Sequence, residues 1–560
     1  METISHRRLR LLFALFAMLS LVLAGRVGYW QTIARGELLA LATEQIRTDQ
    51  ALPARRGVIH DRNGAILATT VDLRSLYAIP ALIPDLDAAA ADLAVLLGRD
   101  AAELRARLGS GAEWLFLARR LPEETALAVE ALGLPGLGFR LEPKRLYPND
   151  GIAAHVLGFV SDDGLGQYGV EGWHDALLRG VDGRLVAERD PAARELAIGL
   201  REARPPRDGA DLVLTIDLAI QTAAERGLRD ALDREKATAG TIVVVDPRDG
   251  AVLALASAPS YHPAGVAIAD PESLRDRAVA WSYEPGSTMK AVTVAAGIEE
   301  GVVDRTTVYD DVGYADVGGR RLYNALGRAW GPTTVTEILE RSANAGAVMV
   351  GAKLGAERQH EYLLRFGFGA PTGVDLAGEI AGQVRPLAEW YPVDVGTAAF
   401  GQGLTVTPLQ LAVAYAALAN GGTLYRPYVV AAWRDAEGEH RAEPVAVRRV
   451  VSEDTAEQLR AMLTSAVDDG LANRAALEAF SVAGKTGTAQ IPSPDGRYVD
   501  DEYISSFAGF FPASEPRFVV VVVIERPESR LLGTVTAMDA FKALAQDVLR
   551  YARVQPDRSP

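Results

Sequence analysis

The chain has 560 residues, of which 49% are hydrophobic and 23% charged, and its formal net charge is −15. This length exceeds one ordinary core, so two or more domains are expected, and the negative charge excludes a nucleic-acid binder, which needs a basic patch. Cysteine is absent and the seven histidines are scattered without metal-ligand spacing, so we expect no disulfide, no metal site and no cofactor.

The first predicted element is an apolar N-terminal segment. Leu9–Trp30 has Arg10 and Arg26 as its only charges, and its length is close to the ~20 residues that cross a bilayer as a helix. By the positive-inside rule, the basic residues at its start predict a short cytoplasmic tail, residues 1–8, with the rest of the chain on the periplasmic side. A cleaved signal peptide is the alternative, but no small-residue cleavage site follows the segment. We therefore expect a single-pass anchor in the cytoplasmic membrane.

Residues 31–205 are predicted to form a membrane-proximal domain. Within it, Ala54–Thr70 is typical of two short strands joined at Asn63-Gly64, a dipeptide that favours a tight hairpin turn. The Ala/Leu-rich segments Asp87–Leu108 and Pro122–Leu132 each have apolar residues at helical spacing. They predict two helices in a small packed subdomain.

A second domain is expected over residues 206–553, with a tail over 554–560. The polar, proline-containing segment Gly199–Asp211 is typical of a boundary between folded units. After it, Thr241–Ala256 is typical of two strands joined by a turn, and the apolar run Arg517–Arg526 is typical of a strand covered on both faces. The stretch between them is mainly helical, which predicts an α+β domain with an antiparallel sheet packed between helices.

One helix in this domain has clear start and stop signals. Thr407 precedes Pro408, and Gln410 completes a capping box with Thr407. Asn420-Gly421 is a typical stop signal. The sequence predicts a helix between these signals.

The stretch EPGSTMK contains a serine that is either a helix cap or a nucleophile. Serine is a common N-cap residue, and S-x-x-K by itself arises by chance in many chains. Two further motifs follow Ser287 and Lys290 in order: Ser342–Asn344 and Lys485–Thr488. In the forms S-x-x-K, S-D-N and K-T-G, these three motifs together are typical of penicillin-binding proteins and class A β-lactamases. The trio favours catalysis over capping.

The spacing also suits a serine with its own base. On a helix, residues i and i+3 share a face, so Lys290 can accept the proton of Ser287 if its amine is neutral. Burial and the charge of Lys485 would both lower the pKa of Lys290. The helix N-terminus and a backbone N–H near Thr488 would stabilise the oxyanion, and losing one such donor typically costs ~3 kcal/mol.

At this point the sequence resembles the class B penicillin-binding proteins, membrane-anchored peptidoglycan DD-transpeptidases, over nearly its whole length. The resemblance rests on RGVIHDRNGAILA, RLYPND, AAHVLGFV and GQYGVEGWHDALLRGVDG in the first domain, and on LTIDLAIQ, EPGSTMK, AFGQGLTVTPLQLA and VAGKTGTAQ in the second. It implies one transmembrane helix, an extended β-rich pedestal domain with a small helical subdomain, and a transpeptidase domain like the serine β-lactamases.

The resemblance implies a role for each motif residue. Ser287 would be acylated by a stem peptide ending in D-Ala-D-Ala, with Lys290 as the base. Ser342 would pass protons to the leaving amine, and Asn344 would bind the substrate amide. The oxyanion hole would consist of the backbone N–H groups of Ser287 and Thr488. The positive charge and the carboxylate-binding groups would come from the third motif: Lys485, Thr486, Gly487 and Thr488.

Two other kinds of protein share these motifs with the transpeptidases. A class A β-lactamase needs a deacylating glutamate, and Glu379 is not in the E-x-x-L-N context. A β-lactam sensor or scaffold that only binds would keep the motifs. Within class B, Glu284 before PGST and the form GQGLTVTPLQ resemble the division-type (FtsI-like) branch more than the elongation branch. No repeat modules follow the last strand, which disfavours a sporulation-type variant.

The resemblance also implies partners. These are peptidoglycan stem peptides, β-lactam antibiotics, other cell-wall synthesis proteins, and a SEDS-type glycosyltransferase, FtsW-like or RodA-like, in the membrane. The apolar face of Leu9–Trp30 is a candidate for the last contact, although a lipid-facing helix has the same pattern. We expect septal cell-wall synthesis during division, with elongation as the alternative.

Overall fold

The computed structural model describes residues 2–38, 47–188, 201–492, 498–528 and 532–559. Their contacts divide the chain into two compact units, one of residues 1–55 with 179–209 and one of residues 56–178 with 210–560. The second unit contains all three sequence motifs, so the candidate active site lies in it.

The first unit contains the predicted membrane helix. Helix α1 runs over Glu2–Thr32, and its part His6–Thr32 is long and apolar enough to cross a membrane, with a mean hydropathy of 2.1. The unit also contains an antiparallel sheet in the order β1-β8-β9. Its strands are β1 Arg47–Leu52, β8 Gly183–Glu188 and β9 Arg201–Arg204. Residues 199 and 200, where the predicted boundary segment begins, lie outside the described residues.

The second unit begins with the predicted hairpin. Strands β2 Ile59–His60 and β3 Ile66–Ala78 pair antiparallel. The turn between them has Gly64 at φ 88°, and the Asp61 carboxylate accepts the N–H groups of Asn63 and Ala65 at 2.9 and 2.7 Å. The Asn63-Gly64 prediction is confirmed.

The helical subdomain differs from the prediction in one respect. The single helix expected over Asp87–Leu108 is wrong, because the structure has two helices there. Gly98 ends the first in the left-handed region at φ 62°, and the Asp100 side chain caps the second by accepting the N–H of Glu103. The elements here are α3 Leu86–Leu97, α4 Ala101–Leu108, β4 Leu115–Leu121, α5 Glu123–Ala131 and β5 Leu137–Leu146.

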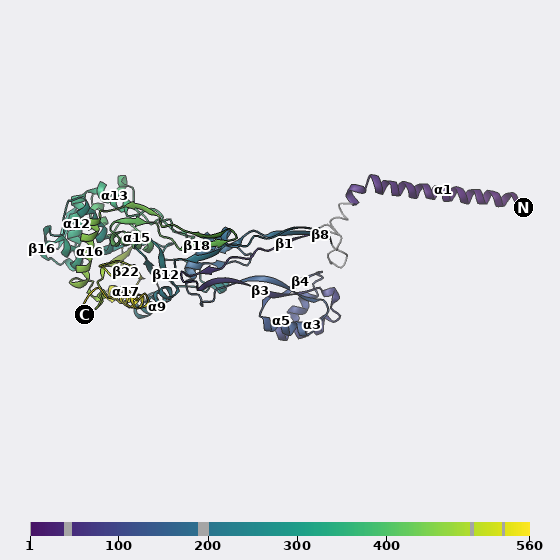
Figure 1. Ribbon diagram of the computed structural model, residues 1–560, viewed down its shortest axis with the longest axis horizontal. Helices are drawn as coiled ribbons and strands as arrows, with labels where there is room; N and C mark the ends of the chain where they lie inside the picture. The colour runs from purple at the N-terminus through teal and green to yellow at the C-terminus, as the bar shows by residue number, and fades with distance from the viewer. Residues whose placement is uncertain (1, 39–46, 189–200, 493–497, 529–531, 560) are drawn as a thin grey trace. The chain divides into compact units, whose positions relative to one another are not determined.

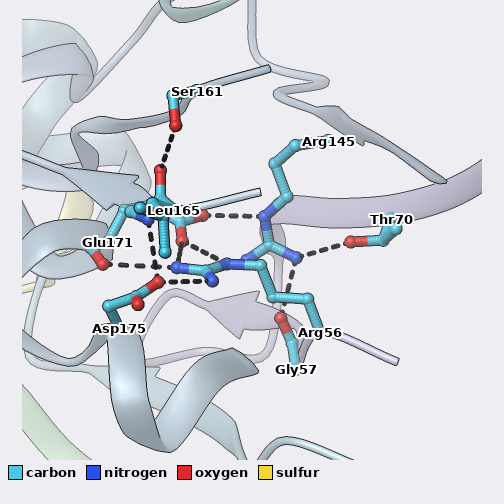
Figure 2. Close-up of polar contacts among 9 residues, drawn as sticks. Arg56, Gly57, Thr70, Arg145, Ser161, Leu165, Glu171 and Asp175 are labelled. Atoms are coloured by element: carbon cyan, nitrogen blue, oxygen red, sulfur yellow. Dashed lines mark hydrogen bonds and ion pairs between the residues drawn. The ribbon is translucent and has the colours of Figure 1, made fainter. Parts of the chain in front are cut away.

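A buried charge cluster joins three sequence motifs of the first predicted domain (Figure 2). Glu171, on α7 (Gly169–Trp173), has a fully buried side chain. One carboxylate oxygen accepts Nε of Arg145 at 2.7 Å, and the other accepts Nε of Arg56 at 2.7 Å. Arg56 also donates to Asp175 at 2.7 Å. The segments RGVIHDR, RLYPND and YGVEGW are therefore held together by one carboxylate.

This region is continuous with the second predicted domain through a sheet. Strand β2 pairs in parallel with β10 (Asp211–Leu214), and β10 pairs with β18 (Val430–Asp435). The sheet has the order β19-β18-β10-β2-β3-β4, with β5 also paired to β3. Backbone hydrogen bonds thus connect the β2–β3 hairpin to strand β10, which begins the predicted domain that contains the motifs.

The central sheet of the unit has five strands in the antiparallel order β12-β11-β23-β22-β21. Helices α9 (Leu218–Glu235) and α17 (Leu532–Tyr551) pack on one face (Figure 1), while α10 and α15 belong to the core of the other. Every residue of β23 is buried, as predicted. The predicted α+β fold is confirmed. The strands are β11 Ala239–Val245, β12 Val252–Ala258, β21 Ala483–Pro492, β22 Tyr498–Phe511 and β23 Phe518–Glu525.

Most elements between β12 and β21 are helices and short hairpins. Helix α15 has the predicted capping box, with Thr407 and Gln410 bonded to each other's backbone N–H, and it ends at Asn420. The elements of this stretch include η4 Gly286–Met289, α10 Lys290–Glu299, β13 Val308–Asp311, β14 Tyr314–Val317, β15 Arg320–Tyr323, β16 Gly331–Thr334, α11 Val335–Arg341, α12 Asn344–Leu354, α13 Ala356–Arg365, α14 Asp394–Ala399, α15 Pro408–Ala419, β17 Thr423–Tyr425, β19 Gly438–Arg441, β20 Ala446–Arg449 and α16 Glu453–Asp468.

We expect Glu171→Ala to lower the free energy of unfolding by about 3–5 kcal/mol, because it leaves the guanidinium of Arg145 buried without its carboxylate. The matched control is Glu439→Ala, which removes the exposed pair with Arg434 and is expected to cost at most about 1 kcal/mol. Thermal unfolding of the full chain in detergent compares the two variants. Equal, small changes in Tm would contradict this role of the cluster.

Candidate active site

Ser287 lies in a short 3-10 turn directly before a buried helix. The turn is η4, and Lys290 is the first residue of α10. The N-cap positions are Pro285 for η4 and Met289 for α10, and neither makes a side-chain cap bond. Ser287 therefore does not occupy a capping position, and the helix-cap alternative is wrong.

The amine of Lys290 is buried and has fixed acceptors. The residue is 0% exposed, and Nζ donates to the carbonyl oxygen of Ser342 at 2.6 Å and to Oδ1 of Asn344 at 2.7 Å. Burial lowers the pKa of Lys290 well below its usual value, and the charge of Lys485 lowers it further. The Ser342 hydroxyl is a third and more distant neighbour at 3.3 Å, so a neutral amine can donate its two N–H groups to the two close acceptors and keep its lone pair for a proton.

Ser342 lies between the two lysines. It ends α11 in the left-handed region at φ 55°, and this turn precedes α12, whose first residue is Asn344. Its Oγ is 3.3 Å from Nζ of Lys290 and 3.0 Å from Nζ of Lys485. The second motif is thus bonded to both other motifs.

The third motif lies on β21 at the edge of the central sheet. Lys485 is buried, and burial lowers its pKa to about 7. Its Nζ also donates to Oγ1 and the carbonyl oxygen of Thr486, each at 3.2 Å. Burial and the charge of Lys485 both lower the pKa of Lys290, which favours the neutral amine that a general base requires.

Three glycines allow the motif segments to approach each other. A Cβ on Gly286, which has φ 56°, would lie 2.9 Å from the carbonyl oxygen of Thr488. A Cβ on Gly487 would lie 2.3 Å from Oγ of Ser506, and one on Gly401 would lie 2.2 Å from the carbonyl oxygen of Gly286. A side chain at Gly286 or Gly487 would press the serine turn and β21 apart, and one at Gly401 would press on the serine turn from another side.

Comparison with known proteins identifies the family to which this chain belongs. Residues 240–546 match the family described as the penicillin binding protein transpeptidase domain, and residues 51–214 match the penicillin-binding protein dimerisation domain. The chain belongs to the class B penicillin-binding proteins. Within this class the chain is FtsI-like.

Individual class B relatives align along nearly the whole chain. Stage V sporulation protein D of Bacillus subtilis is 35% identical over 99% of this chain and 87% of its own length. Peptidoglycan D,D-transpeptidase FtsI of Escherichia coli is 32% identical over 96% of this chain and 90% of its own. The crystal structure of penicillin binding protein 3 from Mycobacterium tuberculosis, complexed with aztreonam, has a TM-score of 0.72 at 28% identity and covers 91% of this chain and 98% of that one.

Two contacts of this class B site were not predicted from the sequence. The buried carboxylate of Glu284 accepts the N–H of Gly403 at 2.8 Å and the hydroxyl of Tyr498 at 3.2 Å, and burial raises its pKa. The Thr534 hydroxyl at the start of α17 lies 2.7 Å from that of Thr488. From the sequence, Glu284 was interpreted only as a feature of the division-type branch, and no contact was predicted for it.

Glu379, the candidate for a deacylating glutamate, stabilises a loop through hydrogen bonds to its backbone. Its carboxylate accepts the backbone N–H of Thr372 at 2.7 Å and that of Gly373 at 3.0 Å. These bonds give Glu379 a structural role in the described chain. They favour the transpeptidase over the β-lactamase alternative.

We expect acylation by a fluorescent penicillin to slow as the pH falls through the lowered pKa of Lys290, because protonation removes the base. The rate should be highest where the amine of Lys290 is neutral and Lys485 is still charged, and it should fall as the pH rises through the Lys485 pKa of about 7, because the charge expected to bind the carboxylate is lost. Lys290→Arg, which keeps a cation but no base, should reduce the rate by about 10²–10⁴-fold. A stopped-flow pH series measures both effects. Acylation that speeds up as the pH falls through the Lys290 pKa would contradict the assignment.

Proposed function

We propose that this class B penicillin-binding protein is a serine DD-transpeptidase that cross-links peptidoglycan stem peptides through an acyl-enzyme on Ser287. The observation on which this rests is the convergence of two buried lysine amines on Ser342 Oγ, one of them that of Lys290, three residues after Ser287. Relatives named as peptidoglycan D,D-transpeptidases support it.

In the first half of the reaction, Ser287 Oγ attacks the carbonyl between the last two D-Ala residues, and its proton passes to the neutral amine of Lys290. The backbone N–H groups of Ser287 and Thr488 stabilise the oxyanion. When the C–N bond breaks, the proton reaches the leaving D-Ala amine through the Ser342 hydroxyl. The products are free D-Ala and an ester on Ser287.

In the second half, the amine of a neighbouring stem attacks the ester. Lys290 takes up a proton from this amine, again through Ser342, and returns one to Ser287 Oγ as the ester bond breaks. A new peptide bond has then formed and the serine is free. Asn344 holds the substrate amide, and the donor's terminal carboxylate is held by Lys485, Thr486, Gly487 and Thr488.

The same steps make Ser287 the site of β-lactam acylation. A β-lactam presents a strained amide to the same nucleophile, but its leaving nitrogen stays tethered. For the cellular role we propose septal synthesis during division, supported by the form of the Glu284 and GQGLTVTPLQ segments and by the FtsI relatives. Elongation remains the alternative, and a sporulation protein aligns at similar identity.

We further propose that α1 is a single-pass anchor with residues 1–8 inside and the site on the periplasmic side. The pedestal would comprise residues 31–205 and the transpeptidase domain residues 206–553. A SEDS-type glycosyltransferase would contact the anchor and pedestal. The apolar face of α1 supports that contact.

Intact-mass measurement of the full chain after incubation with penicillin tests the central assignment. Wild type should gain one adduct and Ser287→Ala none, because in the sequence Ser287 alone among the serines stands three residues before a lysine. Ser282→Ala, in the same segment, is the matched control and should be acylated like wild type. A folded wild-type protein without an adduct would refute the proposed catalytic role of Ser287 and favour the scaffold alternative.

A further inference from the structure

Two buried polar side chains lie next to the second motif. Asp311 at the end of β13 is 1% exposed, and Asn324 directly after β15 is 5% exposed. The Asn324 amide donates to both carboxylate oxygens of Asp311, at 2.8 and 2.9 Å. The same carboxylate accepts the backbone N–H of Gly313 at 2.8 Å and the hydroxyl of Tyr309 at 3.1 Å. Because a buried carboxylate needs such donors, Asp311 fixes the position of the Asn324 side chain.

Asn324 connects the end of β15 to the start of α12. Its backbone N–H donates to the carbonyl oxygen of Gly313 at 2.9 Å, and its amide also donates to the carbonyl oxygen of Arg328 at 2.9 Å. The remaining polar atom, Oδ1, accepts the backbone N–H of Ala345 at 2.8 Å. Ala345 is the second residue of α12, and the first N–H groups of a helix have no partner within it. Asn324 therefore supplies the acceptor that the first turn of α12 needs.

The residue before Asn324 binds the side chain of the second motif. The carbonyl oxygen of Tyr323 accepts Nδ2 of Asn344 at 3.0 Å, while Oδ1 of Asn344 accepts Nζ of Lys290 at 2.7 Å. An amide has one accepting oxygen and one donating nitrogen, so the Tyr323 carbonyl decides which of the two faces Lys290. The second N–H of Nδ2 is then left for the amide of the substrate.

Helix α12 is in close contact with the same network. A Cβ on Gly346 would lie 2.4 Å from the hydroxyl oxygen of Tyr309 and 2.5 Å from Cγ1 of Ile338. The first turn of α12 therefore has no room to move toward these side chains, and moving away would break the bond from Ala345 to Asn324. The start of α12 is fixed in both directions.

We propose that Asn324, fixed by Asp311, is a positioning residue of the transpeptidase reaction. It holds the Tyr323 carbonyl and the start of α12 at the spacing in which Asn344 presents its oxygen to Lys290 and an N–H to the substrate. Asn324 thus acts through Asn344. This deepens the proposed function and rests on it.

The test is a double-mutant cycle on the rate at which a fluorescent penicillin acylates the full chain in detergent. Asn324→Ala should slow acylation about tenfold, the factor expected from losing a hydrogen bond that orients a reacting group. In an Asn344→Ala background, the same substitution should leave the rate within about twofold, because the side chain that Asn324 positions is absent. A residue that supports only the fold would slow both backgrounds by the same factor.

Asn420 provides a matched control at the end of α15. Its amide donates to the carbonyl oxygens of Pro247 and Thr423 at 2.7 and 2.8 Å, and its Oδ1 accepts the backbone N–H of Thr423 at 2.9 Å. Asn420→Ala therefore removes the same kinds of bond as Asn324→Ala. It should lower the Tm of the chain but keep the wild-type acylation rate.

Asp311→Asn is the second variant, for use if Asn324→Ala does not fold. It keeps the shape of the side chain and one accepting oxygen, so it should slow acylation about threefold, and again only where Asn344 is present. Equal losses in both backgrounds, or a wild-type rate in either folded variant, would overturn the proposal. A wild-type chain that penicillin does not acylate would refute the transpeptidase function itself, which is a separate result.

Discussion

The site depends on two buried lysine amines that both contact the hydroxyl group of one serine, Ser342. Lys290 and Lys485 are both buried, and an ammonium group removed from water is costly unless it is fully paired. Their Nζ atoms both approach Ser342 Oγ, and no carboxylate pairs with either in the described chain. Two ammonium charges are unfavourable there, and the pKa values of both lysines are lowered, which favours a neutral amine at Lys290.

This arrangement explains much of the surrounding structure. Gly286 and Gly487 are needed because the serine turn must touch β21. Behind that turn, the Tyr415 hydroxyl of α15 donates to the carbonyl oxygen of Thr288 at 2.8 Å. The capping box at Thr407 fixes where α15 begins, and so where that tyrosine lies. Buried backbone contacts thus fix the position of the serine turn.

Local signals predicted much of this fold. The Asn63-Gly64 turn and the Thr407 capping box depend on residues a few positions apart, and both were predicted correctly. The break at Gly98 was missed although Gly98 and Asp100 are ordinary cap residues, because the apolar spacing continues across them. Gly318-Gly319 is likewise a local turn signal, but no hairpin was predicted there.

The remaining features arise from tertiary structure. The β2–β10 pairing joins segments assigned to separate domains, and nothing local to either strand indicates it. The Thr488–Thr534 and Glu284–Tyr498 contacts depend on how α17 and β22 pack near the motifs. The three motifs were recognisable because their residue types are dictated by the chemistry, whereas their supporting contacts are dictated by packing.

The most direct test of the account is the protonation state of the two lysines. The chain has six lysines, Lys144, Lys236, Lys290, Lys353, Lys485 and Lys542, so ¹³Cε-lysine labelling of the full chain gives few NMR signals, assignable with Lys290→Arg and Lys485→Arg. The account predicts that the signals of Lys290 and Lys485 both titrate well below the pH range usual for a lysine. A Lys290 signal that stays protonated until the pH of an ordinary lysine would contradict it.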